Sequence, residues 1–223
     1  MPTSPNTNIA RLDRSNPHYP SRLNDLSDPP RSLYIYGEPR LLNLPMIAIV
    51  GSRAASRDGL KNAIHFAQAL SKAGLLVISG LARGVDGAAH HGALQLGPDY
   101  TTLAVCGTGL DMVYPPEHMD LARLIGQRGL LISELAPGVG PKASHFPRRN
   151  RLIAALSLGV LVIEAAERSG SLITARLAAE LGREVFAVPG PIHNPQARGC
   201  HQLIQQGAKL TQTPHDILEE LKI

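Results

Sequence analysis

MIAIVGSRAASRDGLKNAIHFAQALSKAGLLVIS, residues 46–79, contains the structural unit that the rest of the chain repeats. It begins with an apolar run of strand length at 46–50, passes through a glycine-containing loop, and continues into a segment of helical period at 57–72. A second apolar run at 75–79 closes it. Apolar runs without alternating polar residues are typical of strands covered on both faces, so the stretch predicts a β-α-β unit of a parallel sheet.

The same rhythm continues to the end of the chain. Strands are expected at 46–50, 75–79, 101–105, 130–134, 160–164 and 184–188, and helices at 57–72, 86–95, 117–127, 149–157, 171–181 and 199–206. Residues 33–37 predict an additional edge strand, and residues 214–223 a closing amphipathic helix. The pattern predicts an α/β fold with an open, doubly wound, mostly parallel sheet and helices on both faces.

The chain divides into three expected parts. Residues 1–31 are rich in Pro, Asn, Ser and Asp, which predicts a disordered segment at 1–18. Residues 19–45 are expected to form a short extension that packs on the core, and residues 46–223 to form the α/β domain.

Composition limits the compartment and the ligand class. The 223 residues contain 22 Lys and Arg against 18 Asp and Glu, and this mild excess favours phosphate-bearing partners. Cys106 and Cys200 have no metal-ligand spacing, which indicates a reducing compartment. No signal-peptide core and no run of 18 apolar residues occur, so we expect a cytoplasmic protein without a membrane partner.

Glycine, small hydroxyl and arginine residues follow several of the predicted strands. In a doubly wound sheet the carboxyl ends of the strands share one edge, and ligands bind there. Glycine lets a ligand approach the backbone closely, while arginine and helix N-termini supply positive charge. The candidates in these loops are Gly51, Ser52, Arg53, Gly80, Arg83, Gly84, Ser169 and Gly170. The glycines could also serve only tight turns, and Ser169 could serve only as a helix cap.

Arg148, Arg149 and Arg151 come at the start of a predicted helix, where the helix dipole disfavours cations. This placement favours an anionic partner. The alternative is pairing with carboxylates of the same chain, such as Glu134 or Glu164.

The sequence contains no recognised catalytic motif. The patterns GxxxxGK[ST], GxGxxG, GxSxG and HExxH do not occur. His90 and His91 are adjacent on a predicted helix and cannot share a face, which argues against a joint metal site. We therefore expect no catalytic residues, no cofactor and no bound metal, and a binding protein in place of an enzyme.

Short motifs distributed over residues 19–210 form a combination far more specific than any one of them. They read YPxxL at 19–23, DPPxxLY at 28–34, GSR at 51–53, SGLARGVD at 79–86, AH at 89–90, GLDxxYP at 109–115, FPxRNR at 146–151, SGSLxTA at 169–175, VFAVPG at 185–190 and LIxxGA at 203–208. Together they resemble the DprA/Smf family.

This resemblance implies an extended Rossmann-like protein of natural transformation that binds and protects incoming single-stranded DNA and helps load the RecA recombinase. It also implies a homodimer. The winged-helix domain and the N-terminal helical module of many members have no counterpart in these residues. The residues expected to contact DNA are Gly51, Ser52, Arg53, Gly80, Arg83, Gly84, Lys142, Phe146, Arg149, Asn150, Arg151, Ser169 and Gly170. The family often has a basic residue where Ala143 stands, so Lys142 is its candidate substitute.

Alternatives remain at several of these positions. Phe146 could stack on a base, as Tyr114 could, or Phe146 could simply pack in the core. Leu203, Ile204 and Gln205 could form a two-fold interface with residues 209–212, or Leu203 and Ile204 could pack on the sheet. At the level of function the rival is a Rossmann-like enzyme acting on nucleoside phosphates, similar to the phosphoribohydrolases, although their PGGxGTxxE motif is missing. A module whose arginines dock acidic proteins is a third possibility.

Overall fold

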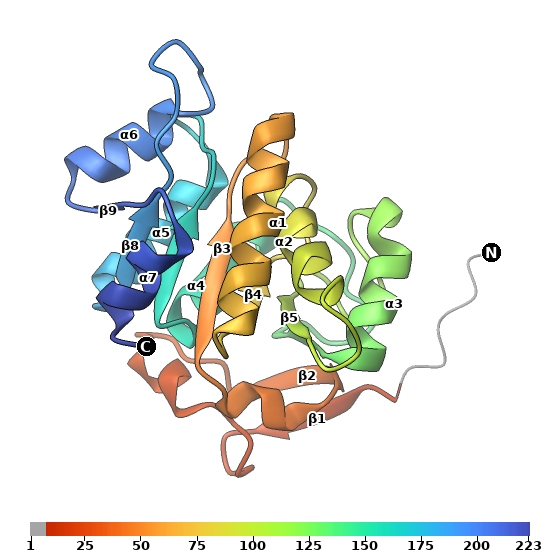
Figure 1. Ribbon diagram of the computed structural model, residues 1–223. Helices are drawn as coiled ribbons and strands as arrows, with labels where there is room; N and C mark the ends of the chain where they lie inside the picture. The colour runs from red at the N-terminus through yellow and green to blue at the C-terminus, as the bar shows by residue number, and fades with distance from the viewer. Residues whose placement is uncertain (1–7) are drawn as a thin grey trace.

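A single sheet runs through the centre of the computed structural model, which describes residues 8–223. The described residues contribute nine strands in the order β1-β2-β6-β5-β4-β3-β7-β8-β9. Their bounds are β1 Ala10–Asp13, β2 Ser32–Gly37, β3 Met46–Val50, β4 Leu76–Ser79, β5 Thr102–Val105, β6 Leu130–Ser133, β7 Gly159–Val162, β8 Glu184–Ala187 and β9 Lys209–Leu210. Strands β3 to β9 pair in parallel, while β1 and β2 are antiparallel to their neighbours (Figure 1).

The strand order reverses beside β3. The chain first builds outward from β3 through β4, β5 and β6, then returns to place β7 on the other side of β3 and continues to β8 and β9. The predicted doubly wound, mostly parallel sheet is therefore confirmed, and β3 and β7 flank its topological switch point.

Helices cover both faces of the sheet, as the sequence predicts (Figure 1). One face carries α1 Arg57–Lys72, α2 Val85–Leu94, α3 Met119–Arg128 and α7 Pro214–Leu221, and the other carries α4 His145–Leu156, α5 Gly170–Glu180 and α6 Arg198–Gln205. Three short 3-10 helices, η1 Ser21–Asp25, η2 Pro39–Asn43 and η3 Pro116–His118, lie in the connections. The main difference from the expected bounds is α4, which begins at His145 and so places Phe146 inside the helix.

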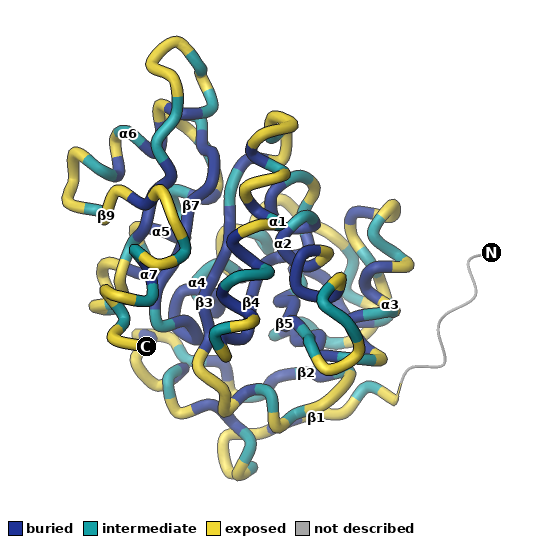
Figure 2. The backbone as a smooth tube through the Cα atoms, viewed as in Figure 1, coloured by how far each residue is buried: buried dark blue, intermediate teal, exposed yellow. Residues whose placement is uncertain are grey.

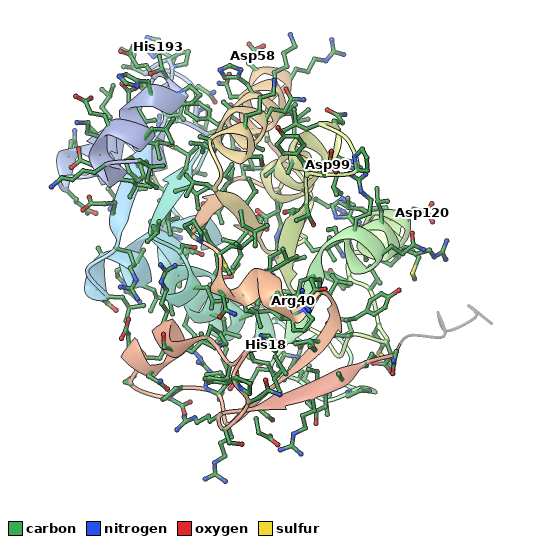
Figure 3. All side chains as sticks on the ribbon, turned by 60° about the horizontal axis from the view of Figure 1, so that its bottom comes forward. His18, Arg40, Asp58, Asp99, Asp120 and His193 are labelled. Atoms are coloured by element: carbon green, nitrogen blue, oxygen red, sulfur yellow. The ribbon has the colours of Figure 1, made fainter. Side chains whose placement is uncertain are left out.

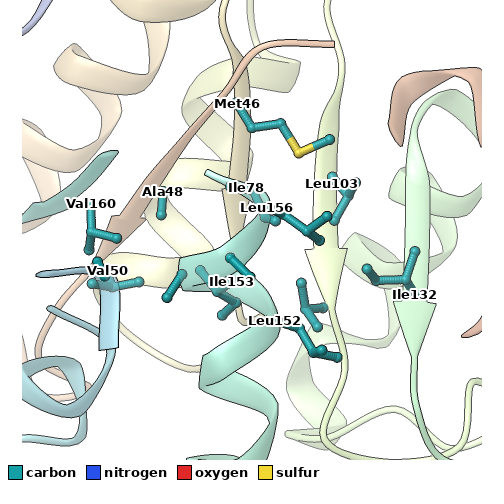
Figure 4. Close-up of a cluster of buried hydrophobic side chains, with 14 of the residues drawn as sticks. Met46, Ala48, Val50, Ile78, Leu103, Ile132, Leu152, Ile153, Leu156 and Val160 are labelled. Carbon is teal, nitrogen blue, oxygen red and sulfur yellow. The ribbon is translucent and has the colours of Figure 1, made fainter. Parts of the chain in front are cut away.

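Alternating residues of the strands pack against the helices on the two faces of the sheet. Ala48 and Val50 of β3 face α4, where they pack in one cluster with Leu152 and Ile153 (Figure 4). Ile47, from the same strand, packs toward α1 in a second cluster. Strands β3 to β7 are buried along their length, and exposed residues lie on the outer turns and the outer faces of helices (Figure 2). Burying both faces explains why the strand sequences show no alternation.

The N-terminal part of the chain is ordered further than predicted. Residues 1–7 lie outside the described part, but Ala10 already pairs with Ile35, and the predicted disorder is wrong for residues 10–18. Leu12 is 5% exposed, and the Tyr19 hydroxyl donates to the Pro30 carbonyl at 2.6 Å. Burial of these side chains offsets the polar composition of the segment. Strand β2 consequently lies between β1 and β6 and is not the predicted edge strand.

The segment 19–45 joins the sheet at the end away from the strand carboxyl termini. Leu23, Leu33 and Leu42 are buried in the cluster beneath α4. Figure 3 shows Asp58 and His193 toward one end of the molecule and His18 and Arg40 toward the other. The carboxyl ends of the parallel strands therefore stay open. Within residues 8–223, no helix combines the length and apolar character that a membrane crossing requires.

Candidate functional site

A cleft of about 770 Å³ opens at the switch point. The loop after β3 forms one wall, the loop after β7 and the start of α5 form another, and the beginning of α4 forms the third. Most residues that the sequence singles out line this cleft: Gly51, Ser52, Arg53, Lys142, Phe146, Arg149, Asn150, Ser169 and Gly170. Because they come from separate loops, only the fold brings them together.

Arg53 connects this cleft with two neighbouring hollows. A small pocket of about 40 Å³ contains Gly80 and Arg83 beside Arg53, and a groove between α1 and α2 contains Gly84 beside Arg53. Among the residues predicted to contact DNA, Arg151 lines none of these three hollows.

At two positions neighbouring atoms lie so close to the backbone that only glycine fits. Gly84 has a φ of +71°, and a Cβ there would overlap the Ser52 carbonyl. A Cβ on Gly80 would overlap the guanidinium of Arg149. Both glycines therefore have a packing role, whatever ligand the loops also admit.

Hydrogen bonds at both ends hold the loop that carries Arg53. The Ser52 N–H donates to the Glu164 carbonyl at 2.7 Å. The Glu164 carboxylate accepts from the Ser56 N–H at 2.8 Å and from its hydroxyl at 2.6 Å. The Ser56 hydroxyl oxygen in turn accepts from the Gly59 N–H at 3.0 Å and caps α1. Arg53 is thus an exposed cation on a fixed backbone.

Arg149 forms the floor of the cleft and is only 6% exposed. Its Nη1 donates to the carbonyls of Gly80 and Val105, and its Nε donates to Asn150 Oδ1 at 3.1 Å. Asp86 lies close by and accepts from the Gly80 N–H at 3.1 Å. Burial raises the pKa of Asp86 and lowers the pKa of Arg149, and each charge opposes the shift of the other. Arg149 is therefore chiefly a structural cation.

The other two arginines of α4 pair with carboxylates. Arg151 is 13% exposed at its side chain and donates to both Glu134 carboxylate oxygens at 2.6 Å. Arg148 contacts Glu134 at 3.3 Å and Asp28 at 3.2 Å. The alternative of intramolecular pairing applies to both arginines. The guanidinium of Arg151 contacts Glu134 and the residue does not line the cleft, so its DNA contact stays a prediction.

Three exposed cations at the cleft have no carboxylate within 4.0 Å in the described part of the chain. They are Arg53, Lys142 and Arg168. Arg83, by contrast, is paired with Glu117. Arg168 is an addition to the set of predicted DNA contacts, and its place in the loop between β7 and α5 is the sequence signal that points to it. Ala143 also lines the cleft, beside Lys142.

An aromatic pair lies at the mouth of the cleft. The ring centroids of Phe146 and Tyr114 are 5.3 Å apart, with the planes inclined by 42°. The guanidinium carbon of Arg53 lies 5.6 Å from the Phe146 centroid, which is cation–π distance. Phe146 is half-buried and packs against Gly107, so it both contributes to packing and borders the cleft.

The N-terminus of α5 faces the same space. Ser169 is its cap and accepts from the Ser171 N–H at 3.4 Å, so the capping role is confirmed. Asn150 donates to the Gly170 carbonyl at 3.3 Å and ties α4 to α5. The positive end of the helix dipole adds to the charge of Arg168. Thr174 and Gln196 also line the cleft, without a sequence pattern that points to them.

The residues predicted to form a two-fold interface differ in their exposure to solvent. Leu203 is 8% exposed and packs in the core under α6, which agrees with the packing alternative, while its place in an interface stays a prediction. Ile204 is half-buried and Gln205 is exposed. Leu210 of the edge strand β9 is 45% exposed.

No group of three His, Cys, Asp or Glu residues suited to hold a metal ion occurs within residues 8–223. His90 is fully buried, and its Nδ1 lies 2.8 Å from the Thr102 hydroxyl oxygen. Thr102 donates to the Val77 carbonyl, so the Nδ1–H of His90 donates to the Thr102 hydroxyl oxygen. Cys106 and Cys200 are free thiols.

Fold and cleft together define an α/β protein of the Rossmann type with a cationic site at its switch point. The chain belongs to the DNA recombination-mediator protein A family, whose model matches residues 11–222, and the resemblance to the DprA/Smf family is thereby confirmed. It is 50% identical to Protein Smf of Escherichia coli over 92% of this chain and spans 54% of that protein's length.

Two solved structures extend this similarity to three dimensions. The X-ray structure of DNA processing protein A from Streptococcus pneumoniae superposes with a TM-score of 0.91 at 46% identity, covering 96% of this chain and 74% of that one. DNA processing protein A from Helicobacter pylori, described with a single-stranded DNA binding mode, gives a TM-score of 0.87 at 30% identity over 97% of both chains.

Proposed function

We propose that the cleft binds single-stranded DNA and that the protein acts in natural transformation, where it protects incoming DNA and helps load the RecA recombinase. The observation that carries the DNA-binding part is a set of three cations, Arg53, Lys142 and Arg168, around one cleft at the switch point, with no ion-pair partner within residues 8–223. Similarity to the H. pylori protein supports the choice of a single strand. Protection and RecA loading rest on the family alone.

The cations of the cleft contact the phosphates of the strand, and its aromatic rings contact the bases. Arg53, Lys142 and Arg168 contact phosphates, with backbone N–H groups at the start of α5 as additional donors. The exposed face of Tyr114, which is 43% exposed, and that of Phe146 stack on a base. A duplex hides its base faces, so the aromatic pair favours a single strand. Arg149 and Asn150 hold the floor and the α5 contact in place.

Binding is preferred to catalysis on nucleoside phosphates. The buried carboxylate nearest the cleft, Asp86, accepts from the N–H groups of Gly80 and Ala82 and lies beside Arg149. Both N–H groups donate to the same oxygen, Oδ2, so this carboxylate serves to hold the loop after β4 in place. The absence of the phosphoribohydrolase motif from the sequence argues in the same direction.

We also propose a homodimer and a cytoplasmic location. Ile204, Gln205 and Leu210 lie on the side of the sheet edge formed by β9, where a second copy could bury the exposed Leu210. The two free thiols agree with a reducing compartment.

Fluorescence anisotropy with three ligands tests the function. An oligothymidylate, a duplex of the same length and thymidine monophosphate are titrated in the same buffer. We expect the oligothymidylate to bind most tightly, the duplex more weakly and the monophosphate weakest. Preference for the monophosphate would support the enzyme alternative, and failure of all three to bind would refute the proposal.

A further inference from the structure

The cleft continues into two grooves on opposite sides, and they differ in charge. The α1–α2 groove shares Arg53 with the cleft and has a volume of about 610 Å³. The α5–α6 groove shares Arg168 and Ser169 with the cleft and has a volume of about 780 Å³. A strand longer than the cleft must leave through one of these grooves or cross the rim.

No carboxylate lines the α1–α2 groove in the described part of the chain. Its polar residues besides Arg53 are His91, Gln95 and His118, and Gly87 packs closely against the His118 ring. His91 is exposed and His118 half-buried, with Nδ1 donating to the Leu81 carbonyl at 2.9 Å. This bond fixes the ring of His118. The groove thus offers hydrogen-bonding groups without a repelling charge.

The α5–α6 groove has the opposite character. Glu167 and Glu184 line it, and the rest of its wall is largely apolar, with Leu172, Val185 and Leu203. Its cations other than Arg168 are already paired, because Arg176 contacts Glu180 at 3.5 Å and Arg183 contacts Asp25. Of its two carboxylates, Glu167 contacts Arg198 at 3.6 Å, whereas Glu184 forms no ion pair within residues 8–223. Phosphates entering this groove would therefore meet the Glu184 carboxylate.

We propose that the bound single strand leaves the cleft past Arg53 and runs along the α1–α2 groove, where His91, Gln95 and His118 contact the nucleotides that follow. This inference rests on the proposed function. Arg53 lines the cleft and the groove and lies against Phe146, so it is the point where the strand passes from one to the other. The carboxylate of Glu117, next to His118 in the chain, is occupied by Arg83.

Two matched substitutions test the path. Gln95 is the exposed C-cap of α2 in the α1–α2 groove, and Gln206 is the exposed C-cap of α6 in the α5–α6 groove. Gln95→Glu and Gln206→Glu each add one negative charge with the same shape at the same kind of helix end. Any cost in helix stability is therefore similar in both variants.

Binding is measured with oligothymidylates of about 4 and about 12 nucleotides. We expect Gln95→Glu to weaken the longer ligand about fivefold and to leave the shorter one unchanged, since one repulsion at contact distance in water corresponds to about that factor. Gln206→Glu should change neither. Weakening by Gln206→Glu alone, equal weakening by both, or no effect of Gln95→Glu would overturn the path. Unchanged binding of the short ligand would then still support the proposed function, whereas a parent protein that binds neither ligand would refute both.

Discussion

The Arg149 guanidinium lies against the backbone of Gly80 and donates a hydrogen bond to its carbonyl oxygen. The same nitrogen donates to the Val105 carbonyl, and Asp86 accepts from the Gly80 N–H. Arg149 and Asp86 thereby join α4 and α2 to the carboxyl ends of β4 and β5. These buried hydrogen bonds of Arg149 and Asp86 hold the floor of the cleft rigid.

Removing the Arg149 side chain should therefore lower the free energy of unfolding. Arg149→Ala leaves two buried carbonyls without their donor and removes the positive charge near the buried Asp86, at an expected cost of about 3–5 kcal/mol. Arg148→Ala, an exposed neighbour on the same helix, should cost at most about 1 kcal/mol. Urea unfolding measures both. Equal stabilities of the two variants would show that the Arg149 contacts do not stabilise the fold.

Arg53→Ala should weaken DNA binding without lowering the stability of the fold. We expect at least about a tenfold loss of oligothymidylate affinity, the usual scale for a charged hydrogen bond, with an unchanged urea midpoint. The control is Arg40→Ala, which removes the same charge from a side chain 83% exposed in the N-terminal segment (Figure 3). A similar loss in both variants would mean that overall charge, and not the cleft, governs binding.

Glu117 should weaken DNA binding, because its ion pair with Arg83 keeps that cation from contacting phosphate. The hydrogen bond from Arg83 holds the pKa of Glu117 below its usual range, so the carboxylate is charged at neutral pH. Glu117→Gln frees a fourth cation beside Arg53, which should tighten oligothymidylate binding and steepen its log–log salt slope by about 0.7. Glu220→Gln breaks the Lys209 ion pair, 3.0 Å long, and serves as the control. Tightening by the control alone would contradict this role of Glu117.

His90 should make stability depend on pH below neutrality. Burial lowers the pKa of His90 to about 3, so the unfolded chain binds a proton at this residue that the folded chain does not. Stability should therefore fall as pH drops below about 6.5, by about 2 kcal/mol at pH ~5 from this residue. His90→Asn keeps a donor for Thr102 and should have a smaller difference between urea midpoints at the two pH values. An unchanged difference would contradict the assignment.

The dimer proposal places Leu210 in the interface. Leu210→Glu should convert the dimer to monomer in analytical ultracentrifugation at micromolar concentration, because the new carboxylates would be buried at the interface. Ile192→Glu alters a side chain 74% exposed elsewhere and should leave the dimer intact. A parent protein that sediments only as monomer would rule out the dimer.

The sequence predicts the fold well because strands buried on both faces produce unbroken apolar runs, as at Met46–Val50. Strand β1 escapes prediction since only Leu12 among its residues is buried. Neighbours in sequence also need not be neighbours in space. On α4, Arg149 turns into the cleft floor while Arg151 reaches Glu134, and no sequence pattern distinguishes the two. The sequence correctly groups the loops, but it does not reveal which cations already have partners.

Salt dependence of oligothymidylate binding tests the central claim most directly. The three cleft cations that lack an ion-pair partner among the described residues predict a slope of log K against log salt of about −2 for a single strand. The Arg53→Ala variant should lower its magnitude to about 1.4. A slope near zero, or a parent slope that Arg53→Ala leaves unchanged, would contradict phosphate binding in this cleft.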